Sequence, residues 1–155
     1  MVSIMKIISD NNTLTIGAFE PVSLPALNME NIIAKVDTGA YSGAVHCTEI
    51  KVRRRQSDGV KVLHFVPSGN GPDTIELEKY KVTNVRSSSG HRLKRYLIET
   101  DIIIRDKRYT VNIGLSDRSD MQREVLIGRR FLRENGILVD VRINQGLDND
   151  GGEKI

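Results

Sequence analysis

Within this 155-residue sequence, the residues best suited to chemistry are Asp37, Thr38 and Gly39. They directly follow residues 32–36, which begin with an apolar, partly β-branched run of the kind that forms a buried strand, so the carboxylate is expected where that strand ends. Gly39 lets the backbone turn tightly there. A carboxylate in such a position can act as a general acid or base. Asp and Gly are also common in ordinary turns, so the tripeptide by itself favours a plain loop.

A second stretch, residues 125–132, changes this interpretation. Its apolar residues lead to Gly128 and then to helix-forming residues, which predicts a strand that ends at a glycine and continues into a short helix. The motif Asp37-Thr38-Gly39-Ala40, followed far downstream by Leu126-Ile127-Gly128-Arg129, resembles the two signatures of the retropepsin-like aspartic proteases.

Further motifs are similar to one branch of that family, the bacterial and archaeal proteins often labelled ATP-dependent zinc proteases. The resemblance spans about residues 16–141 and includes Leu24-Pro25-Ala26-Leu27, Lys35-Val36-Asp37-Thr38-Gly39-Ala40, Ser42, Ala44, His46, Val85-Arg86-Ser87-Ser88-Ser89-Gly90-His91, Arg95, Arg118, Met121 and Leu126-Ile127-Gly128-Arg129. It implies a small all-β fold, a closed barrel of retropepsin type with one short C-terminal helix. It also implies peptidase activity with Asp37, Thr38 and Gly39 as the catalytic motif. The residues implied in substrate binding are Ala40, Ser42, His46, Arg86, Ser88, Gly90, Arg95, Arg118, Gly128 and Arg129.

Hydrolysis of a peptide bond by carboxylates needs two of them close enough to share one proton. This chain has one Asp-Thr-Gly motif and no internal repeat, so the second carboxylate must come from a second copy. We therefore expect a homodimer with Asp37 of each subunit at a two-fold axis. In the geometry that the resemblance implies, Thr38 braces the loop across this axis and Gly128 packs beneath it.

Ser42 and His46 follow Asp37 closely, so a Ser-His-Asp nucleophile is an alternative. Ser42, however, lacks the glycine context of a nucleophile elbow. A hydrogen-bonding role next to Asp37 is the better prediction for both residues.

No cofactor is expected, although the family label mentions zinc and ATP. The soft metal ligands are His46, Cys47, His64 and His91, and they form neither a His-Glu-x-x-His nor a Cys-x-x-Cys motif. Neighbours in a strand point to opposite faces, so His46 and Cys47 are not expected to bind one ion. We expect a buried cysteine and surface histidines. The glycine-rich loop that cradles ATP phosphates is also absent.

Residues 86–92, together with Lys94 and Arg95, form a basic segment at a predicted hairpin tip. The resemblance implies that this hairpin is the flap over the substrate. Guanidinium groups suit paired recognition of carboxylates, which favours an acidic, Glu-rich peptide as substrate. Some family members occur with ATP-grasp glutamate ligases that add glutamate tails, which implies a functional association of the same kind.

A different class of function is a non-catalytic module that binds an anionic protein or a nucleic acid. The intact Thr38-Gly39 pair favours the enzyme over this alternative. Only four Tyr and three Phe occur in the chain, and the basic stretches lack interleaved aromatic residues, which argues against nucleic acid.

Composition and length indicate one domain with a single core, over residues 1–144, and a disordered tail over residues 145–155. With 39% hydrophobic residues, no stretch approaches the roughly 18 apolar residues of a membrane span. The single Cys47 suits a reducing compartment, and residues 1–10 lack the pattern of a signal peptide, so a cytoplasmic location is expected. The net charge of +3 allows an anionic partner.

Alternating apolar residues and turn-forming residues predict a series of short strands. These are expected at 13–18, 32–36, 45–53 with a bulge, 60–66, 75–85, 96–104, 109–115, 125–127 and 137–141, with one helix at 129–135 that ends before Gly136.

Overall fold

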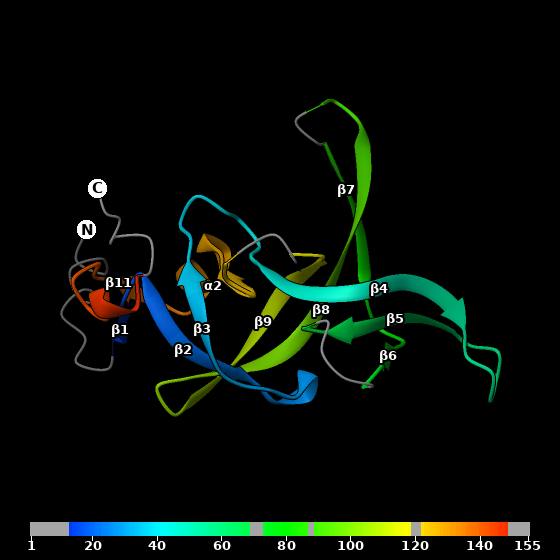
Figure 1. The fold of residues 1–155 in the computed structure, drawn as a ribbon, viewed down its shortest axis with the longest axis horizontal. Helices are drawn as coiled ribbons and strands as arrows, with labels where there is room; N and C mark the ends of the chain where they lie inside the picture. Colours follow the sequence, from blue (N-terminus) through cyan, green and yellow to red (C-terminus); the bar gives the residue numbers. More distant parts are fainter. Residues whose placement is uncertain (1–12, 69–72, 87–88, 119–121, 149–155) are drawn as a thin grey trace.

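The computed structural model describes residues 13–68, 73–86, 89–118 and 122–148 of the chain (Figure 1). Its strands are β1 (Thr15–Ile16), β2 (Phe19–Leu24), β3 (Met29–Val36), β4 (Ala44–Arg54), β5 (Lys61–Pro67), β6 (Ile75–Leu77), β7 (Lys81–Arg86), β8 (Arg92–Ile104), β9 (Lys107–Ser116), β10 (Val125–Ile127) and β11 (Leu138–Val139). The helix α2 spans Arg129–Glu134, and the two 3-10 turns are η1 (Pro25–Leu27) and η2 (Gln145–Leu147).

Six of the strands form a closed barrel. In the order β10, β3, β2, β8, β9, β4, each strand is hydrogen-bonded to the next, and β4 pairs again with β10. The prediction of a small all-β barrel with one short helix near its C-terminal end is therefore confirmed.

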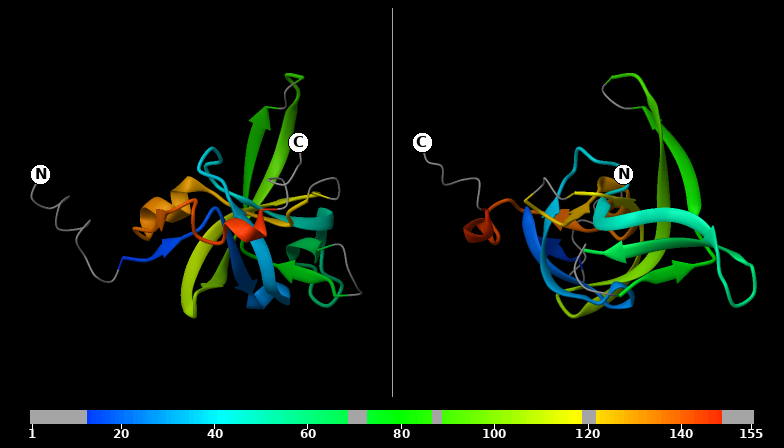
Figure 2. Two further views of the ribbon diagram at one scale, coloured as in Figure 1. Left: turned by 60° about the vertical axis from the view of Figure 1, so that its left-hand side comes forward. Right: turned by 45° about the vertical axis from the view of Figure 1, so that its right-hand side comes forward.

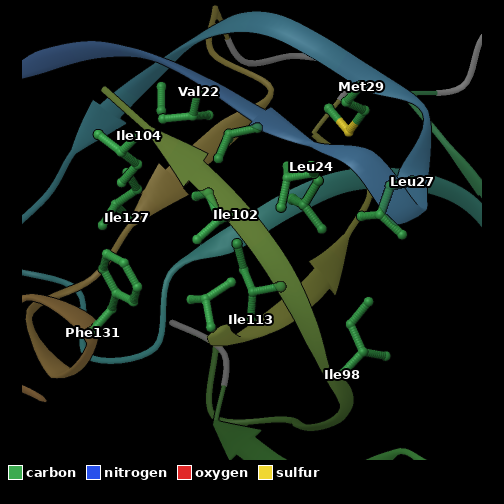
Figure 3. Packing of buried hydrophobic residues seen from close by; sticks show 14 of the residues in the cluster. Val22, Leu24, Leu27, Met29, Ile98, Ile102, Ile104, Ile113, Ile127 and Phe131 are labelled. Atoms are coloured by element: carbon green, nitrogen blue, oxygen red, sulfur yellow. The ribbon is translucent and has the colours of Figure 1, made fainter. Parts of the chain in front are cut away.

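Every second side chain in the later part of β8 points into the barrel and helps to fill its core. Ile98, Ile102 and Ile104 are almost fully buried, and they belong to one cluster with Ile113 of β9 and Ile127 of β10 (Figure 3). Successive side chains of a strand point to opposite faces, so these positions show the predicted period of two. Each such side chain stabilises the fold by about 1.5–3 kcal/mol on burial.

The short strand β10 lies between β3 and β4, and this arrangement organises the region around Asp37. Leu126 and Ile127 pair in parallel with Lys35 and Val36 of β3. On its other side, β10 pairs antiparallel with Ala44 and the following residue of β4. The chain therefore leaves β3 on one side of β10 and returns in β4 on the other, so the intervening loop must pass around the end of β10.

Beyond the barrel, β4 pairs with β5 and β5 with β6. The register of β4 shifts between Thr48 and Lys51, where Glu49 has a φ of 53°, which confirms the predicted bulge. Residues 75–85 do not form the single strand that we expected. β6 ends at Leu77 and pairs with β5, whereas β7 begins at Lys81 and pairs with β8. This Lys- and Glu-rich run has no continuous apolar face that would specify one partner.

The strand β7 and the first half of β8 form a two-stranded arm that projects from the barrel (Figures 1 and 2). Its pairs run from Lys81↔Leu97 to Arg86↔Arg92. In all three views the arm points to the same side of the molecule as the loop between β3 and β4 (Figures 1 and 2). The predicted hairpin is present, and residues 87–88 at its tip lie outside the described residues.

The two ends of the described chain form a separate small sheet. β1 and β11 are parallel, with Thr15 opposite Leu138 and Ile16 opposite Val139. Both strands are shorter than predicted, and they pair with each other instead of extending the barrel. Gly136 follows α2 with a φ of 62°, the left-handed conformation in which glycine commonly ends a helix.

Residues 145–147 form η2, although we expected a disordered tail from residue 145 onward; residues 149–155 lie outside the described ranges. Among the described residues, no helix is long and apolar enough to cross a membrane.

Candidate active site

Asp37 is the first residue of the loop that passes around β10, and backbone groups orient it. Its own N–H donates to the Ile127 carbonyl at 2.8 Å, which continues the parallel pairing of β3 and β10 by one residue. The N–H of Gly39 donates to Asp37 Oδ1 at 2.9 Å, and that of Ala40 donates to the Asp37 carbonyl at 3.1 Å. The half-buried carboxylate is thus held through Oδ1 at the end of a buried strand.

The start of α2 locks the far side of this loop. The first N–H groups of a helix have no partner within the helix, and here the N–H groups of Arg129 and Arg130 donate to the carbonyls of Ala40 (2.8 Å) and Tyr41 (3.0 Å). The Arg129 guanidinium also donates to the Gly39 carbonyl at 3.0 Å. Arg129, which we expected to bind substrate, thus braces the loop of Asp37.

Two glycines make this close approach possible. A Cβ on Gly128 would lie 2.5 Å from the Tyr41 carbonyl oxygen and 2.6 Å from the Gly43 nitrogen. A Cβ on Gly43 would lie 2.5 Å from the Leu126 carbonyl oxygen, and the φ of Gly43 is +72°. Neither position accepts a side chain without moving backbone. Gly128 therefore supports the loop from below, as its motif implied, and Gly43 is a second requirement that the sequence analysis missed.

Arg118 lies within electrostatic reach of the Asp37 carboxylate. Burial and the neighbouring Arg95 guanidinium lower the pKa of Arg118, whereas the Asp37 carboxylate acts on it in the opposite direction. These influences place Arg95, Arg118 and Asp37 in one electrostatic neighbourhood. Arg118 Nε donates to the Arg123 carbonyl at 3.1 Å, which fixes its guanidinium without neutralising it.

The hydrogen bond that the His46 side chain accepts comes from the segment that follows β9. His46 is buried in β4, and its Nδ1 accepts a hydrogen bond from the backbone N–H of Arg118 at 2.8 Å. The Asp117 carboxylate lies 3.8 Å from the same nitrogen. The reason is the parallel pairing of β4 with β9, which sets His46 opposite Ser116 and so brings the next residues over its ring.

The remaining predicted residues fall into two places. Ser42 is half-buried within the loop of Asp37. Arg86 and Gly90 are exposed on the arm, where Gly90 has a φ of 86°. Ser88 lies outside the described residues. The arm therefore supplies its cations from a hairpin that stands on the same side as the loop of Asp37 (Figure 2).

An open cavity of about 450 Å³ borders the loop of Asp37. Thr38 and Arg129 line its rim, and much of the lining is apolar, contributed by Leu132, Ile137 and Leu138. Leu138, at the edge of this cavity, is 49% exposed.

The histidines and the cysteine differ in part from our prediction. Cys47 is fully buried in the core, as expected, and burial raises the pKa of its thiol to about 12. His46 and His64 are buried as well, so the prediction of surface histidines is wrong for both. His46 lies in β4 and His64 in the paired strand β5, and both side chains are covered by the surrounding structure. His91 is exposed. In the described part of the chain, no three His, Cys, Asp or Glu residues are grouped to hold a metal ion.

The closed barrel, the strand β10 between β3 and β4, and the Asp-Thr-Gly loop together define a retropepsin-like protein. Residues 15–145 match the family described as RimB-like, the retropepsin-like aspartic endopeptidase RimB. The chain belongs to this family.

Relatives with similar sequences carry a different name. A probable alpha-L-glutamate ligase from Shewanella pealeana is 32% identical over 133 residues, and one from Desulfotalea psychrophila is 26% identical over 143 residues. These matches cover 84% and 90% of this chain, but the chain spans only 29% and 31% of the two relatives. Among solved structures, a protein of unknown function from Legionella pneumophila is similar, with a TM-score of 0.61 and 26% identity, covering 86% of this chain and 96% of that one.

Proposed function

We propose that this protein is an aspartic endopeptidase that hydrolyses peptide bonds through two Asp37 carboxylates, one from each subunit of a homodimer. The observation that supports this most directly is the loop of residues 37–43, which β10 and α2 hold so that one oriented carboxylate stands at the end of a buried strand. Each chain contributes one such loop, so the dyad needs two chains.

The proposed chemistry divides the work between the two carboxylates, which share one proton. The ionised carboxylate takes a proton from a water molecule as the water oxygen attacks the peptide carbonyl carbon, and the protonated carboxyl gives its proton to the carbonyl oxygen. The tetrahedral intermediate then collapses and the C–N bond breaks. The leaving nitrogen receives the proton that the first carboxylate took from water, and the hydroxyl that becomes the new carbonyl returns its proton to the second carboxylate, which restores the shared proton. The cavity beside Thr38 suits the second copy as its occupant, because it adjoins the residue that would lie at the two-fold axis.

Acidic peptides are the substrate class that the charges around the site favour. Residues 79–98 contain six Lys and Arg and no Asp or Glu, and they include the whole arm. Arg105, Arg108 and Arg142, which lie elsewhere, each have a carboxylate within 3 Å. Arg95 and Arg118 instead influence each other beside Asp37. A peptide carboxylate would supply a partner with charge-assisted hydrogen bonds.

The names of the relatives point in the same direction. They are called probable alpha-L-glutamate ligases, a name that indicates the joining of glutamate. This chain matches less than a third of those proteins, so we do not assign ligase activity to it. We propose instead that it acts on Glu-rich peptides and is functionally associated with a ligase of that kind.

Mixing wild type with Asp37→Asn tests the dyad. Asn keeps the size of the side chain and an oxygen for the Gly39 N–H, but it cannot serve as a base. At equal amounts, random pairing leaves about a quarter of the dimers wild type on both sides, so the rate should fall to about a quarter of that of the unmixed wild type at the same total concentration. Matched mixtures with a variant such as Gly146→Ala, whose added Cβ would meet nothing within 4 Å, control for the exchange itself.

A fall only to one half would identify a monomeric enzyme. Full hydrolysis by Asp37→Asn alone would overturn the assignment. If the wild type binds acidic peptides but does not cleave them, the protein is the non-catalytic binding module that the sequence left as the alternative.

A further inference from the structure

His46 connects three segments of the chain beside the candidate active site. Its backbone N–H donates to the Glu124 carbonyl at 2.7 Å, and its carbonyl accepts from the Ser68 N–H at 2.8 Å. Its imidazole Nδ1 accepts from the Arg118 N–H at 2.8 Å. With only 8% of the residue exposed, the ring is held in place and its acceptor atom is directed at the segment that carries Arg118.

This hydrogen bond depends on the protonation state of the ring. A neutral imidazole has one acceptor nitrogen, so an accepting Nδ1 requires the proton to be on Nε2. In a protonated imidazole both nitrogens are donors, and Nδ1 of His46 would then face the Arg118 N–H donor to donor. The Asp117 carboxylate, 3.8 Å from Nδ1, would attract the protonated ring at the same moment.

The charged groups on the segments packed around His46 are Asp117 and Arg118, which follow β9, and Glu124, which precedes β10. Arg118 has a second anchor, its bond from Nε to the Arg123 carbonyl. Loss of the His46 bond therefore removes one of two anchors that hold its guanidinium near Asp37.

We propose that His46 is a positioning residue that holds Arg118 beside Asp37 only while its imidazole is neutral. Binding of acidic peptides is then switched by the protonation of His46, separately from the titration of the catalytic carboxylates. The inference rests on the proposed function for its substrate class, and it adds a pH dependence that acts on substrate binding rather than on the chemical step.

The test measures binding of a short glutamate peptide to the Asp37→Asn protein by calorimetry, so that nothing is cleaved. Histidine is the side chain that ordinarily titrates between about pH 5 and 8, whereas glutamates stay ionised over most of that range. Lowering the pH from about 7.5 to about 5.5 should weaken binding roughly tenfold, the effect of losing one hydrogen bond to a site group.

Two further variants in the same background isolate His46. In His46→Asn, the amide Oδ1 stands where Nδ1 stood and cannot be protonated, so binding should stay tight at both pH values. In His46→Leu, binding should be roughly tenfold weaker at both. His64→Asn is the matched control, since His64 is another buried histidine on the neighbouring strand β5, and it should keep the pH dependence of the parent.

A parent-like pH dependence in His46→Asn would overturn the inference, as would nitrogen NMR of the ring at neutral pH that shows the proton on Nδ1. The NMR measurement uses the unmodified protein, so it decides the matter even if His46→Leu does not fold. If binding depends on His46 but the wild-type protein hydrolyses no peptide, only the proposed function is contradicted. If the wild-type protein hydrolyses peptides but its binding does not depend on His46, only this inference is contradicted.

Discussion

The side chain of Arg95 lies directly across Gly114. A Cβ at Gly114 would be 3.1 Å from Arg95 Cδ and 3.6 Å from its Cγ, so the bare backbone of β9 forms the surface on which this arginine rests. Arg95 belongs to the arm, yet its side chain rests on the barrel strand β9, and its charge acts on Arg118. The arm and the candidate active site are thereby joined through one flexible side chain and one glycine.

From this contact we predict that Arg95→Gln raises the KM for an acidic peptide about tenfold, because a charge-assisted hydrogen bond is lost. The free energy of unfolding should change by less than about 0.5 kcal/mol, as for other cations near the surface. Arg86→Ala, farther out on the exposed arm, should raise the KM to a smaller degree. Kinetics with an acidic and a neutral peptide of equal length provide the comparison, and equal effects on both peptides would contradict the prediction.

Gly114→Ala offers a second route to the same residue. The added methyl group requires Arg95 to shift, whereas its 3.4 Å distance from the Gly43 carbonyl oxygen, at the end of the loop of Asp37, is an ordinary van der Waals contact. The KM for acidic peptides should therefore rise while kcat changes little. In the double variant with Arg95→Gln, the effect of Gly114→Ala on KM should disappear, since the displaced guanidinium is already gone. Additive effects in this double-mutant cycle would show that Gly114 acts in another way.

Gly128→Ala should be far more damaging. Its Cβ would lie 2.5 Å from the Tyr41 carbonyl oxygen, and backbone rather than a flexible side chain would have to move. We expect a loss of about 2–3 kcal/mol in the free energy of unfolding, together with loss of activity, because the loop of Asp37 is displaced. Urea denaturation compares this variant with Gly146→Ala, for which nothing lies within 4 Å of the added atom. Equal stability of the two variants would contradict the proposed packing.

Local patterns in the sequence predicted the short strands, including the strand before Asp37 and the strand before Gly128, because alternating apolar residues and turn-forming glycines are local signals. The closure of the strands into a barrel was implied by the family resemblance. Gly43 was missed for the opposite reason. Between Ser42 and Ala44 it resembles an ordinary turn residue, and its requirement comes from the Leu126 carbonyl, far along the chain.

The hydrogen-bond partners of His46 and Arg118 could not be predicted from the sequence either. They depend on the parallel register of β4 and β9 and on the Arg123 carbonyl, and a backbone carbonyl is identical at every position of a sequence. The strand expected at 75–85 failed because its Lys- and Glu-rich pattern does not say where one pairing partner ends and the next begins.

Cys47 gives a prediction about alkaline pH. Burial raises the pKa of its thiol from 9.0 to about 12, so the folded chain keeps this proton over an interval in which the unfolded chain releases it. The contribution of this thiol to the free energy of unfolding is fully present below about pH 9. It decreases by about 1.4 kcal/mol per pH unit as the pH rises toward 12. Denaturation of wild type and Cys47→Ala at about pH 8 and 10 tests this, since lysines and tyrosines titrate in both proteins. Parallel pH dependences in the two proteins would refute it.

The final prediction is that activity does not depend on zinc, whatever the family label says. Nδ1 of His46 already accepts the Arg118 N–H, and Cys47, its neighbour, points into the core with a thiol that keeps its proton. Zinc binds thiolate sulfur and unprotonated imidazole nitrogen, so these two adjacent residues offer it no pair of free ligands. Hydrolysis of an acidic peptide should therefore survive EDTA, and elemental analysis of the purified protein should find far less than one zinc per chain. A tightly bound, stoichiometric zinc whose removal abolishes activity, and whose return restores it, would overturn the prediction and would require ligands other than His46 and Cys47 in their present arrangement.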